Sequence, residues 1–168
     1  MTRPRLSHVI HWRRAACAAM LALLAAAPAH AETLGAVDTA FQLLGPDHKV
    51  VVEVFDDPRV GGVSCYLSRA KTGGIKGAIG LAEDKSESSV ACRQVGALQF
   101  NGALPLQEEV FTERASAFFK HVRVVRMVDV KRNALVYLVY SDRLVDGSPT
   151  NSVTAVAVPN GQPIPVRR

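Results

Sequence analysis

The chain has 168 residues, with 20 Lys or Arg and 15 Asp or Glu, and a formal net charge of +5. Four of the 20 basic residues and none of the acids lie in residues 1–31, so the other 137 residues carry 16 basic and 15 acidic side chains. This balance excludes the clustered basic face of a nucleic-acid-binding protein, and the length suits one domain with one hydrophobic core.

Residues 1–31 have the organisation of a signal peptide. Arginines precede an apolar run from Ala15 to Pro28, and Ala29-His30-Ala31 forms a small-residue cleavage site. We therefore expect cleavage after Ala31, export to the periplasm and a single domain over residues 32–168. The apolar run is shorter than the roughly 20 residues that a spanning helix needs, so we expect no transmembrane segment in the mature chain. The Arg13-Arg14 pair keeps twin-arginine export open beside the Sec route.

The cysteines predict one disulfide. Cys17 falls in the signal peptide, so the exported domain keeps Cys65 and Cys92, each in a strand-like segment. A periplasmic chain with two such cysteines most simply joins them, and the lack of a C-x-x-C spacing disfavours a redox or metal-binding pair. The chain-entropy model gives the closed loop of 28 residues a stabilisation of about 3.6 kcal/mol.

Short strands separated by turns make up most of the domain. Lys49–Phe55 is the clearest, with β-branched residues throughout and one charge. Ala134–Ser141 is apolar on both faces, and Lys131-Arg132-Asn133 joins it to the preceding strand as a hairpin. In chain order, the predicted strands are Asp38–Leu44, Lys49–Phe55, Val63–Ala70, Ser88–Val95, at most a short edge strand at Leu98–Phe100, then His121–Val130, Ala134–Ser141 and Ser152–Val158.

Two segments remain open between alternatives. Residues 73–82 carry apolar side chains at helical spacing, but each of their glycines weakens a helix by up to ~1 kcal/mol, so a short helix or an ordered loop fits. Val110–Phe119 mixes aromatic and charged residues and fits a strand or one or two helical turns. Together, the elements predict a mainly β fold: a single antiparallel sandwich or barrel-like domain with one or two short helices.

The stretch between the two cysteines holds the densest glycine and lysine cluster of the domain. It follows neither G-x-x-x-x-G-K-[ST] nor G-x-G-x-x-G, so it does not predict a nucleotide-binding loop. What remains is the hypothesis of a weak anion-binding nest, and the alternative is a solvated basic edge whose glycines only permit tight turns. The ligand-binding residues under this hypothesis are Arg69, Lys71, Gly73, Gly74 and Lys76.

Two motifs of the penicillin-recognising serine enzymes occur here, S-x-x-K from Ser68 to Lys71 and K-T-G from Lys71 to Gly73. Those enzymes place the two lysines on opposite walls of a cleft, and one Lys71 cannot fill both positions. The nearest counterpart of their S-D-N element is Ser141-Asp142-Arg143, in which the amide is replaced. We interpret these matches as coincidence.

A metal site can be drawn from Asp47, His48, Asp56 and Asp57. An extended strand between the two pairs would separate them by roughly 20 Å, which is too far for one ion. Aspartates at such positions commonly form turns, so we expect no metal and no other cofactor. Neither His48 nor His121, the two histidines that follow residue 31, has a sequence-local catalytic partner.

Seven short motifs are spread along the domain. They are Gly45–Lys49, Phe55–Pro58, Cys65–Gly77, Gly80–Asp84, Lys131–Leu135, Tyr140–Asp142 and Gly147–Pro149. These motifs resemble the CreA family, and the resemblance covers essentially all of residues 32–168. It implies an exported periplasmic protein of a Gram-negative bacterium. It supplies no catalytic or binding positions, because the family has no established biochemical activity.

The sequence therefore predicts a small, non-enzymatic periplasmic protein. We expect a binding or accessory module for an unidentified small molecule or envelope protein, with no nucleic-acid partner. The alternative is a small cell-envelope hydrolase or transferase that uses Lys71 or His48 as its base. A cleft lined by both side chains would favour the enzyme, whereas a Lys71 that projects into solvent would argue against it.

Overall fold

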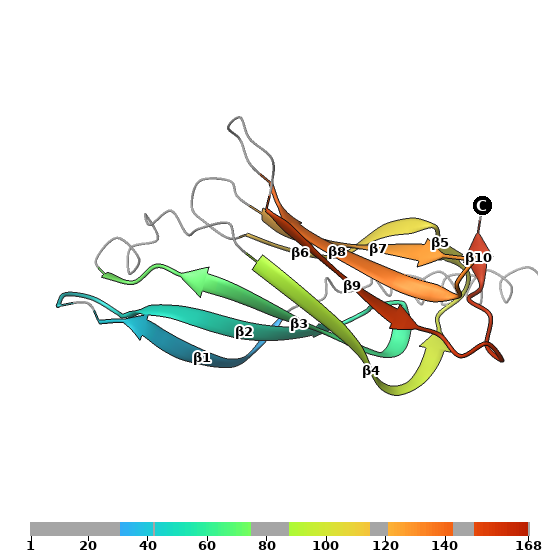
Figure 1. The fold of residues 1–168 in the computed structure, drawn as a ribbon, viewed down its shortest axis with the longest axis horizontal. Coiled ribbons are helices and arrows are strands. Elements are labelled where there is room, and N and C mark those ends of the chain that lie inside the picture. The colour runs from blue at the N-terminus through green and yellow to red at the C-terminus, as the bar shows by residue number, and fades with distance from the viewer. Residues whose placement is uncertain (1–30, 42, 75–87, 115–120, 143–149, 168) are drawn as a thin grey trace, which may run out of the picture.

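The computed structural model describes residues 31–167 except 42, 75–87, 115–120 and 143–149. In the described part of the chain, two antiparallel four-stranded sheets face each other, and they do not close into a barrel (Figure 1). The predicted mainly β, antiparallel fold is therefore confirmed, and of the two predicted alternatives the structure is a sandwich. Among the described residues, no helix has the length and apolar character needed to cross a membrane.

The first sheet contains, in spatial order, β1 (Glu32–Ala40), β2 (His48–Asp56), β3 (Val60–Lys71) and β4 (Ser88–Phe100). Successive side chains of a strand point to opposite faces, so every second residue of β2 and β3 is buried against the other sheet. Phe55, Cys65 and Cys92 lie directly opposite one another across β2, β3 and β4. They form the central row of the buried face.

The second sheet contains β6 (Gln107–Arg114), β7 (His121–Asp129), β8 (Ala134–Ser141) and β9 (Asn151–Ala157). The predicted hairpin joins β7 to β8 through a turn in which Asn133 adopts a φ of 49°. The Asn133 side chain also receives a hydrogen bond from the Ile164 amide at 3.0 Å, which holds the C-terminal tail against the turn. The two-residue strands β5 (Leu104–Pro105) and β10 (Val166–Arg167) pair in parallel beside this sheet.

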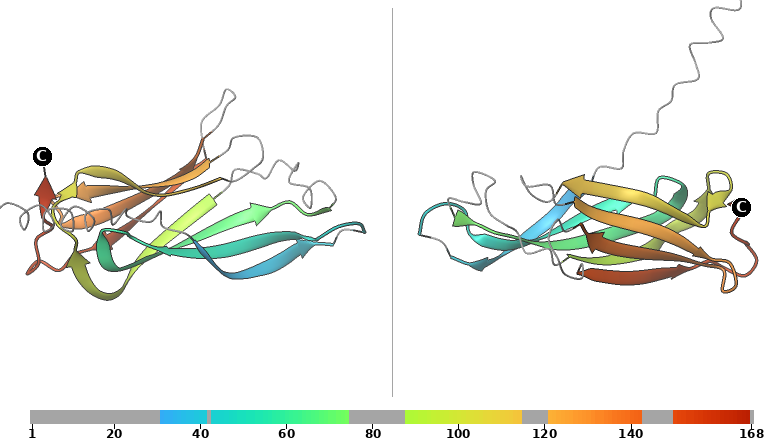
Figure 2. Two further views of the ribbon diagram at one scale, coloured as in Figure 1. Left: turned by 180° about the vertical axis from the view of Figure 1, so that it is seen from behind. Right: turned by 90° about the horizontal axis from the view of Figure 1, so that it is seen from above.

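The hydrophobic core fills the space between the two sheets. The ring of Phe55 stacks on that of Phe111 from the second sheet, with centroids 4.3 Å apart. The Cys65–Cys92 disulfide is fully buried in the same core. At one side of the sandwich β4 lies against β9, where the Val90 amide donates to the Ser152 hydroxyl at 3.0 Å (Figure 2).

The sheets converge at one end and diverge at the other (Figure 1). We call these the narrow end, where β2 ends and β8 begins, and the wide end, where β3 and β6 end. At the narrow end, Arg126 donates through Nη1 to both carboxylate oxygens of Asp57 at 2.7 and 2.8 Å, and through Nη2 to Glu108. The Tyr137 hydroxyl donates to Asp57 at 2.9 Å. A buried polar network therefore joins the two sheets here.

The central pair of this network is closed to solvent, since the side chains of Arg126 and Asp57 are both 0% exposed, while Glu108 is 27% exposed. Burial, together with the Asp57 carboxylate, raises the pKa of Tyr137 above its usual value, so the hydroxyl stays a hydrogen-bond donor. Removing one partner of such a pair would leave an uncompensated buried charge, at a cost of about 3–5 kcal/mol. The network therefore fixes how the sheets meet.

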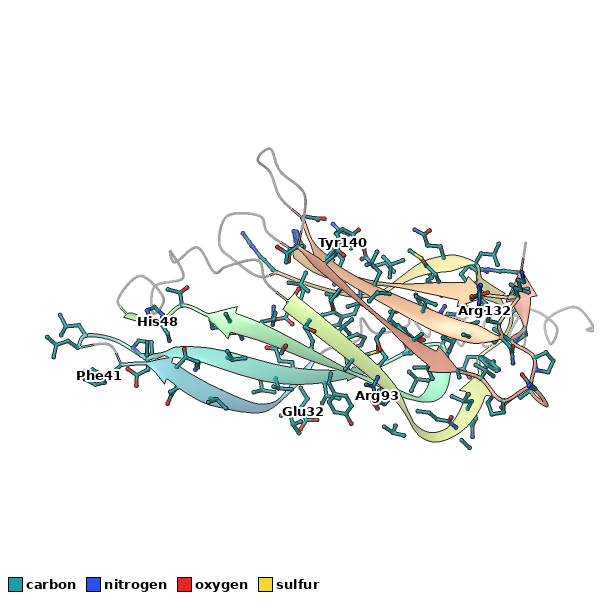
Figure 3. The ribbon with its side chains drawn as sticks, viewed as in Figure 1. Glu32, Phe41, His48, Arg93, Arg132 and Tyr140 are labelled. Atoms are coloured by element: carbon teal, nitrogen blue, oxygen red, sulfur yellow. A yellow bond between two sulfur atoms is a disulfide. The ribbon has the colours of Figure 1, made fainter. Side chains whose placement is uncertain are left out.

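Two predicted strands have the wrong bounds. The first was expected at Asp38–Leu44, but β1 ends at Ala40, and Phe41, Leu43 and Leu44 are exposed in the following turn (Figure 3). Every residue of β1 is exposed, so its sequence lacks the alternation that marks a half-buried strand. The second is β4, which continues to Phe100 instead of breaking near Gly96, because it keeps pairing with the start of β3.

The segments expected as strand or helix are only partly described. Within Val110–Phe119, the residues up to Arg114 belong to β6, which settles that part as strand, while residues 115–120 lie outside the described ranges. The glycine-rich stretch beyond Gly74 also lies outside the described ranges, so the alternative between a short helix and a loop stays open for it.

Replacing Cys65 and Cys92 together by alanine should lower the free energy of unfolding by about 3.6 kcal/mol through the loop-closure term alone. Loss of the buried sulfurs adds to that cost. The measurement is urea unfolding followed by circular dichroism for the oxidised protein, the reduced protein and the double variant. Coinciding midpoints for the oxidised and reduced protein would show that the bridge does not stabilise the fold.

Candidate functional site

Four charged side chains gather between the sheets at the wide end, and we call them the wide-end cluster: Glu53, Arg69, Lys71 and Glu113. Cys65, Leu67, Arg69 and Lys71 occupy alternate positions of β3. Arg69 and Lys71 therefore point toward the second sheet, as the buried Cys65 does. Glu53 faces the same way from β2, and Glu113 comes from β6 in the facing sheet. The cluster thus joins both sheets.

Arg69 is the centre of the wide-end cluster. Its Nη2 donates to Glu53 and, at 2.8 Å, to Oε1 of Glu113. Lys71 Nζ donates to the other carboxylate oxygen of Glu53 at 3.2 Å. The side chains of Arg69 and Glu53 are 7% and 5% exposed, whereas those of Lys71 and Glu113 are 39% and 37% exposed. A buried ion pair is therefore flanked by two partners that reach solvent.

The electrostatics of the cluster favour recognition over acid–base chemistry at Arg69. Burial alone would lower the pKa of Arg69, but hydrogen bonds and charge from Glu113 and Glu53 outweigh it and raise that pKa above its usual value. A guanidinium donates hydrogen bonds and stays protonated, so it does not act as a base. Two cations and two carboxylates also leave the cluster without net charge.

Two buried polar atoms beside this cluster have no hydrogen-bond partner within the described part of the chain: Nε of Arg69 and the hydroxyl oxygen of Ser88. Arg69 and Ser88 lie directly opposite each other in the β3–β4 ladder, so their side chains share the buried face and start close together. A buried polar atom without a partner costs about 1–3 kcal/mol. Such atoms are therefore places where a bound group would add stability.

The same strands line a depression of about 260 Å³, which Thr150 before β9 also borders. Ser68 and Ser89 lie opposite each other there, and so do Val50 and Ala70. The side chains of these four residues alternate with those of Arg69 and Ser88 along the strands. The residues that line the depression are Val50, Ser68, Arg69, Ala70, Ser88, Ser89 and Thr150.

The described residues of the anion-nest hypothesis already have partners within the protein. Arg69 and Lys71 are held by carboxylates, and Lys76 lies outside the described ranges. The amide of Gly73 donates to Nδ1 of His48 at 2.9 Å, and that of Gly74 donates to the Pro46 carbonyl at 2.6 Å. An anion at this backbone would have to displace both internal acceptors.

The residues of the enzyme hypotheses are likewise held by other partners. Lys71 is paired with Glu53, and His48 accepts the Gly73 amide, so each of the two proposed bases already has a contact. Neither of them lines the depression described above. The S-x-x-K spacing falls on a strand, where Ser68 and Lys71 point to opposite faces, and a helix would bring them together.

The residues considered for a metal lie at opposite ends of β2, with Asp47 and His48 at its start and Asp56 and Asp57 at its end. Asp56 accepts the Ser64 hydroxyl at 2.6 Å, and Asp57 is held by Arg126 and Tyr137. The structure does not bring the two pairs together.

Comparison with known sequences places the chain in a family. A family model described as CreA protein matches residues 34–161. The chain belongs to the CreA family. It is similar to Protein CreA of Escherichia coli strain K12, with 55% identity over 134 residues that cover 77% of this chain and 85% of that protein. Protein CreA of E. coli O6:H1 and of E. coli O157:H7 match with the same figures. No solved structure matches this chain significantly.

The CreA match spans every residue of the wide-end cluster as well as Ser88. Sequence reasoning pointed to Arg69 and Lys71 but missed Glu53, Ser88 and Glu113. Glu53 had a signal, because it is an acid in the middle of a valine-rich strand. No signal in the sequence pointed to Glu113. Its contact with Arg69 depends on how the two sheets stack, and the residue pattern of a single strand does not reveal the stacking.

The glycines at the end of β3 have a packing role. A Cβ at Gly73 would lie 2.0 Å from the Pro46 carbonyl oxygen, and a Cβ at Gly45 would lie 2.5 Å from the carbonyl carbon of Gly74. Gly45 and Gly74 also adopt φ values of 90° and 75°, which side chains rarely tolerate. The turn before β2 therefore packs backbone against backbone on the end of β3.

Gly73→Ala should destabilise the protein by roughly 1–3 kcal/mol, because the new methyl group overlaps the Pro46 backbone. The matched control is Gly35→Ala in β1, where an added Cβ meets nothing within 4 Å and stability should change by less than about 0.5 kcal/mol. Urea unfolding measures both. Equal stability of the two variants would refute the close backbone approach.

Proposed function

We propose that this protein is an exported, periplasmic binding or accessory module that recognises a small molecule or a segment of an envelope protein at the wide end. It acts without catalysis. The observation that carries this proposal is the pair of buried, unpartnered polar atoms on Arg69 and Ser88, beside a cluster whose outer partners reach solvent. A bound group that accepts from both atoms would offset their desolvation.

Three observations support export. Residues 1–31 have signal-peptide organisation, and β1 begins at Glu32, the residue after the predicted cleavage site. The disulfide is of the kind that persists in oxidising compartments such as the periplasm. The chain belongs to the CreA family, and the resemblance to this family implied a periplasmic location.

The chemistry of the cluster supports binding over catalysis. Arg69 is a fixed donor, and its orientation is set by carboxylates from both sheets, as a recognition site requires. Lys71 and His48, the bases of the enzyme alternative, are engaged by Glu53 and Gly73. The site therefore offers preorganised hydrogen-bond donors.

A thermal-shift screen of the disulfide-bonded periplasmic protein against amino acids, short peptides, sugars and organic acids tests this function. A compound that binds the native state at 100 times its Kd should stabilise it by about 2.7 kcal/mol, which raises the melting temperature. The shift should fall strongly in Arg69→Lys and persist in the control Arg93→Lys, an exposed arginine of β4. Shifts that are equal in both variants would rule out the wide end as the site.

A further inference from the structure

We propose that the group recognised at the wide end is a carboxylate, which takes the place of Glu113 on the guanidinium of Arg69. This inference rests on the proposed binding function and names the class of its ligand. In the structure, the side chain of Glu113 occupies the position that the ligand would take.

The hydrogen bonds of Arg69 leave one edge of the guanidinium incomplete. A carboxylate binds a guanidinium best through two parallel N–H bonds, and one such edge is formed by Nε and Nη2. Here Nη2 serves both Glu53 and Glu113, while Nε has no partner within the described part of the chain. A carboxylate placed along this edge would gain the Nε bond that Glu113 does not make.

The two glutamates differ in how firmly they are held. Glu53 is 5% exposed and is bound by both Arg69 and Lys71. Glu113 is 37% exposed and reaches Arg69 from the opposite sheet at 2.8 Å. The Glu113 carboxylate regains water when it leaves, whereas the Glu53 carboxylate would remain buried without its partner, so Glu113 is the less costly of the two to displace. Glu113 is therefore the exchangeable partner.

The charge count fits one carboxylate. With Glu113 turned to solvent, the remaining members of the cluster are Arg69, Lys71 and Glu53, whose formal charges sum to +1. One carboxylate restores neutrality at this partly buried position. A phosphate dianion would leave an excess negative charge beside Glu53, and a neutral ligand would leave the excess positive charge unpaired.

Ser88 supplies a further donor to the same ligand. Its buried hydroxyl lies opposite Arg69 across the β3–β4 ladder and has no partner among the described residues. A hydroxyl rotates to suit its acceptor, so it can donate to a carboxylate oxygen held on Arg69. Arg126 also has an unpartnered Nε, but its side chain is 0% exposed at the narrow end, where no ligand can reach it.

The test measures the melting temperature of the disulfide-bonded protein against sodium acetate, with sodium chloride at equal ionic strength as reference. The tripeptide Ala-Ala-Ala and its C-terminal amide form a second arm. We expect acetate and the free-acid tripeptide to stabilise the protein and the amide to have no effect. Binding of acetate alone would assign the carboxylate to small molecules, and tighter binding of the tripeptide would assign it to a peptide C-terminus.

The decisive variant is Glu113→Gln, which removes the competing carboxylate and should tighten acetate binding about tenfold. If Glu113 had only a structural role, Glu113→Gln would respond to acetate as the native protein does, or more weakly. Ser88→Ala should weaken binding, and the control Arg93→Lys should not change it. Glu113 is half-exposed, so its variant tests the proposal even if changes at the buried Arg69 impair folding.

Two results would overturn the inference. In the first, acetate stabilises neither the native protein nor Glu113→Gln more than chloride does. In the second, Glu113→Gln does not raise the affinity for acetate. If, in that case, another class of compound binds and depends on Arg69, the proposed binding function stands and only the carboxylate assignment fails. If no class of compound depends on Arg69, both fail.

Discussion

The buried ion pair between Arg126 and Asp57 is the interaction on which the rest of the structure depends. Asp57 follows β2 of the first sheet and Arg126 lies in β7 of the second, so the pair joins the sheets directly. The two side chains are fully buried, and Tyr137 and Glu108 make further hydrogen bonds to them. Loss of either partner would leave the other as an unpaired buried charge. The pair therefore fixes how the two sheets meet at the narrow end.

The sheets diverge toward the other end (Figure 1), where the wide-end cluster joins them. The disulfide and the stacked rings of Phe55 and Phe111 fill the middle of the core between the two polar ends. Each end therefore contains a buried arginine that carboxylates from both sheets hold. Arg126 is 0% exposed and its partners Asp57 and Glu108 are 0% and 27% exposed, whereas Arg69 is 7% exposed and its partner Glu113 is 37% exposed. The narrow end is therefore the more enclosed of the two.

Much of the fold follows from local sequence patterns. The β-branched residues of β2, the apolar run of β8 and the turn before it were sufficient to predict a mainly β sandwich or barrel-like domain, because such residues favour strands. The two cysteines predicted their own pairing. The start of β1 was missed because a strand exposed on both faces lacks the two-residue alternation of a half-buried strand, and β4 was divided at Gly96 because a glycine usually interrupts a strand.

The site was less predictable, for a physical reason. Arg69 and Lys71 were found because they stand near the glycines, yet those glycines serve close packing against the turn at Gly45. The partners that give Arg69 its chemistry are 16 and 44 residues away along the chain. Which strands face each other, and in which register, decides such contacts, and strand periodicity does not encode that.

The most direct measurement is a ¹H–¹⁵N NMR titration of the arginine Nε–H signals with sodium acetate at constant ionic strength. The Nε–H of Arg69 should shift and saturate, because it gains an acceptor at the wide end. The Nε–H of Arg126, buried at the narrow end, should stay in place and serves as the internal reference. An Arg69 signal that does not move, or one that moves only in parallel with that of Arg126, would contradict a carboxylate site at the wide end.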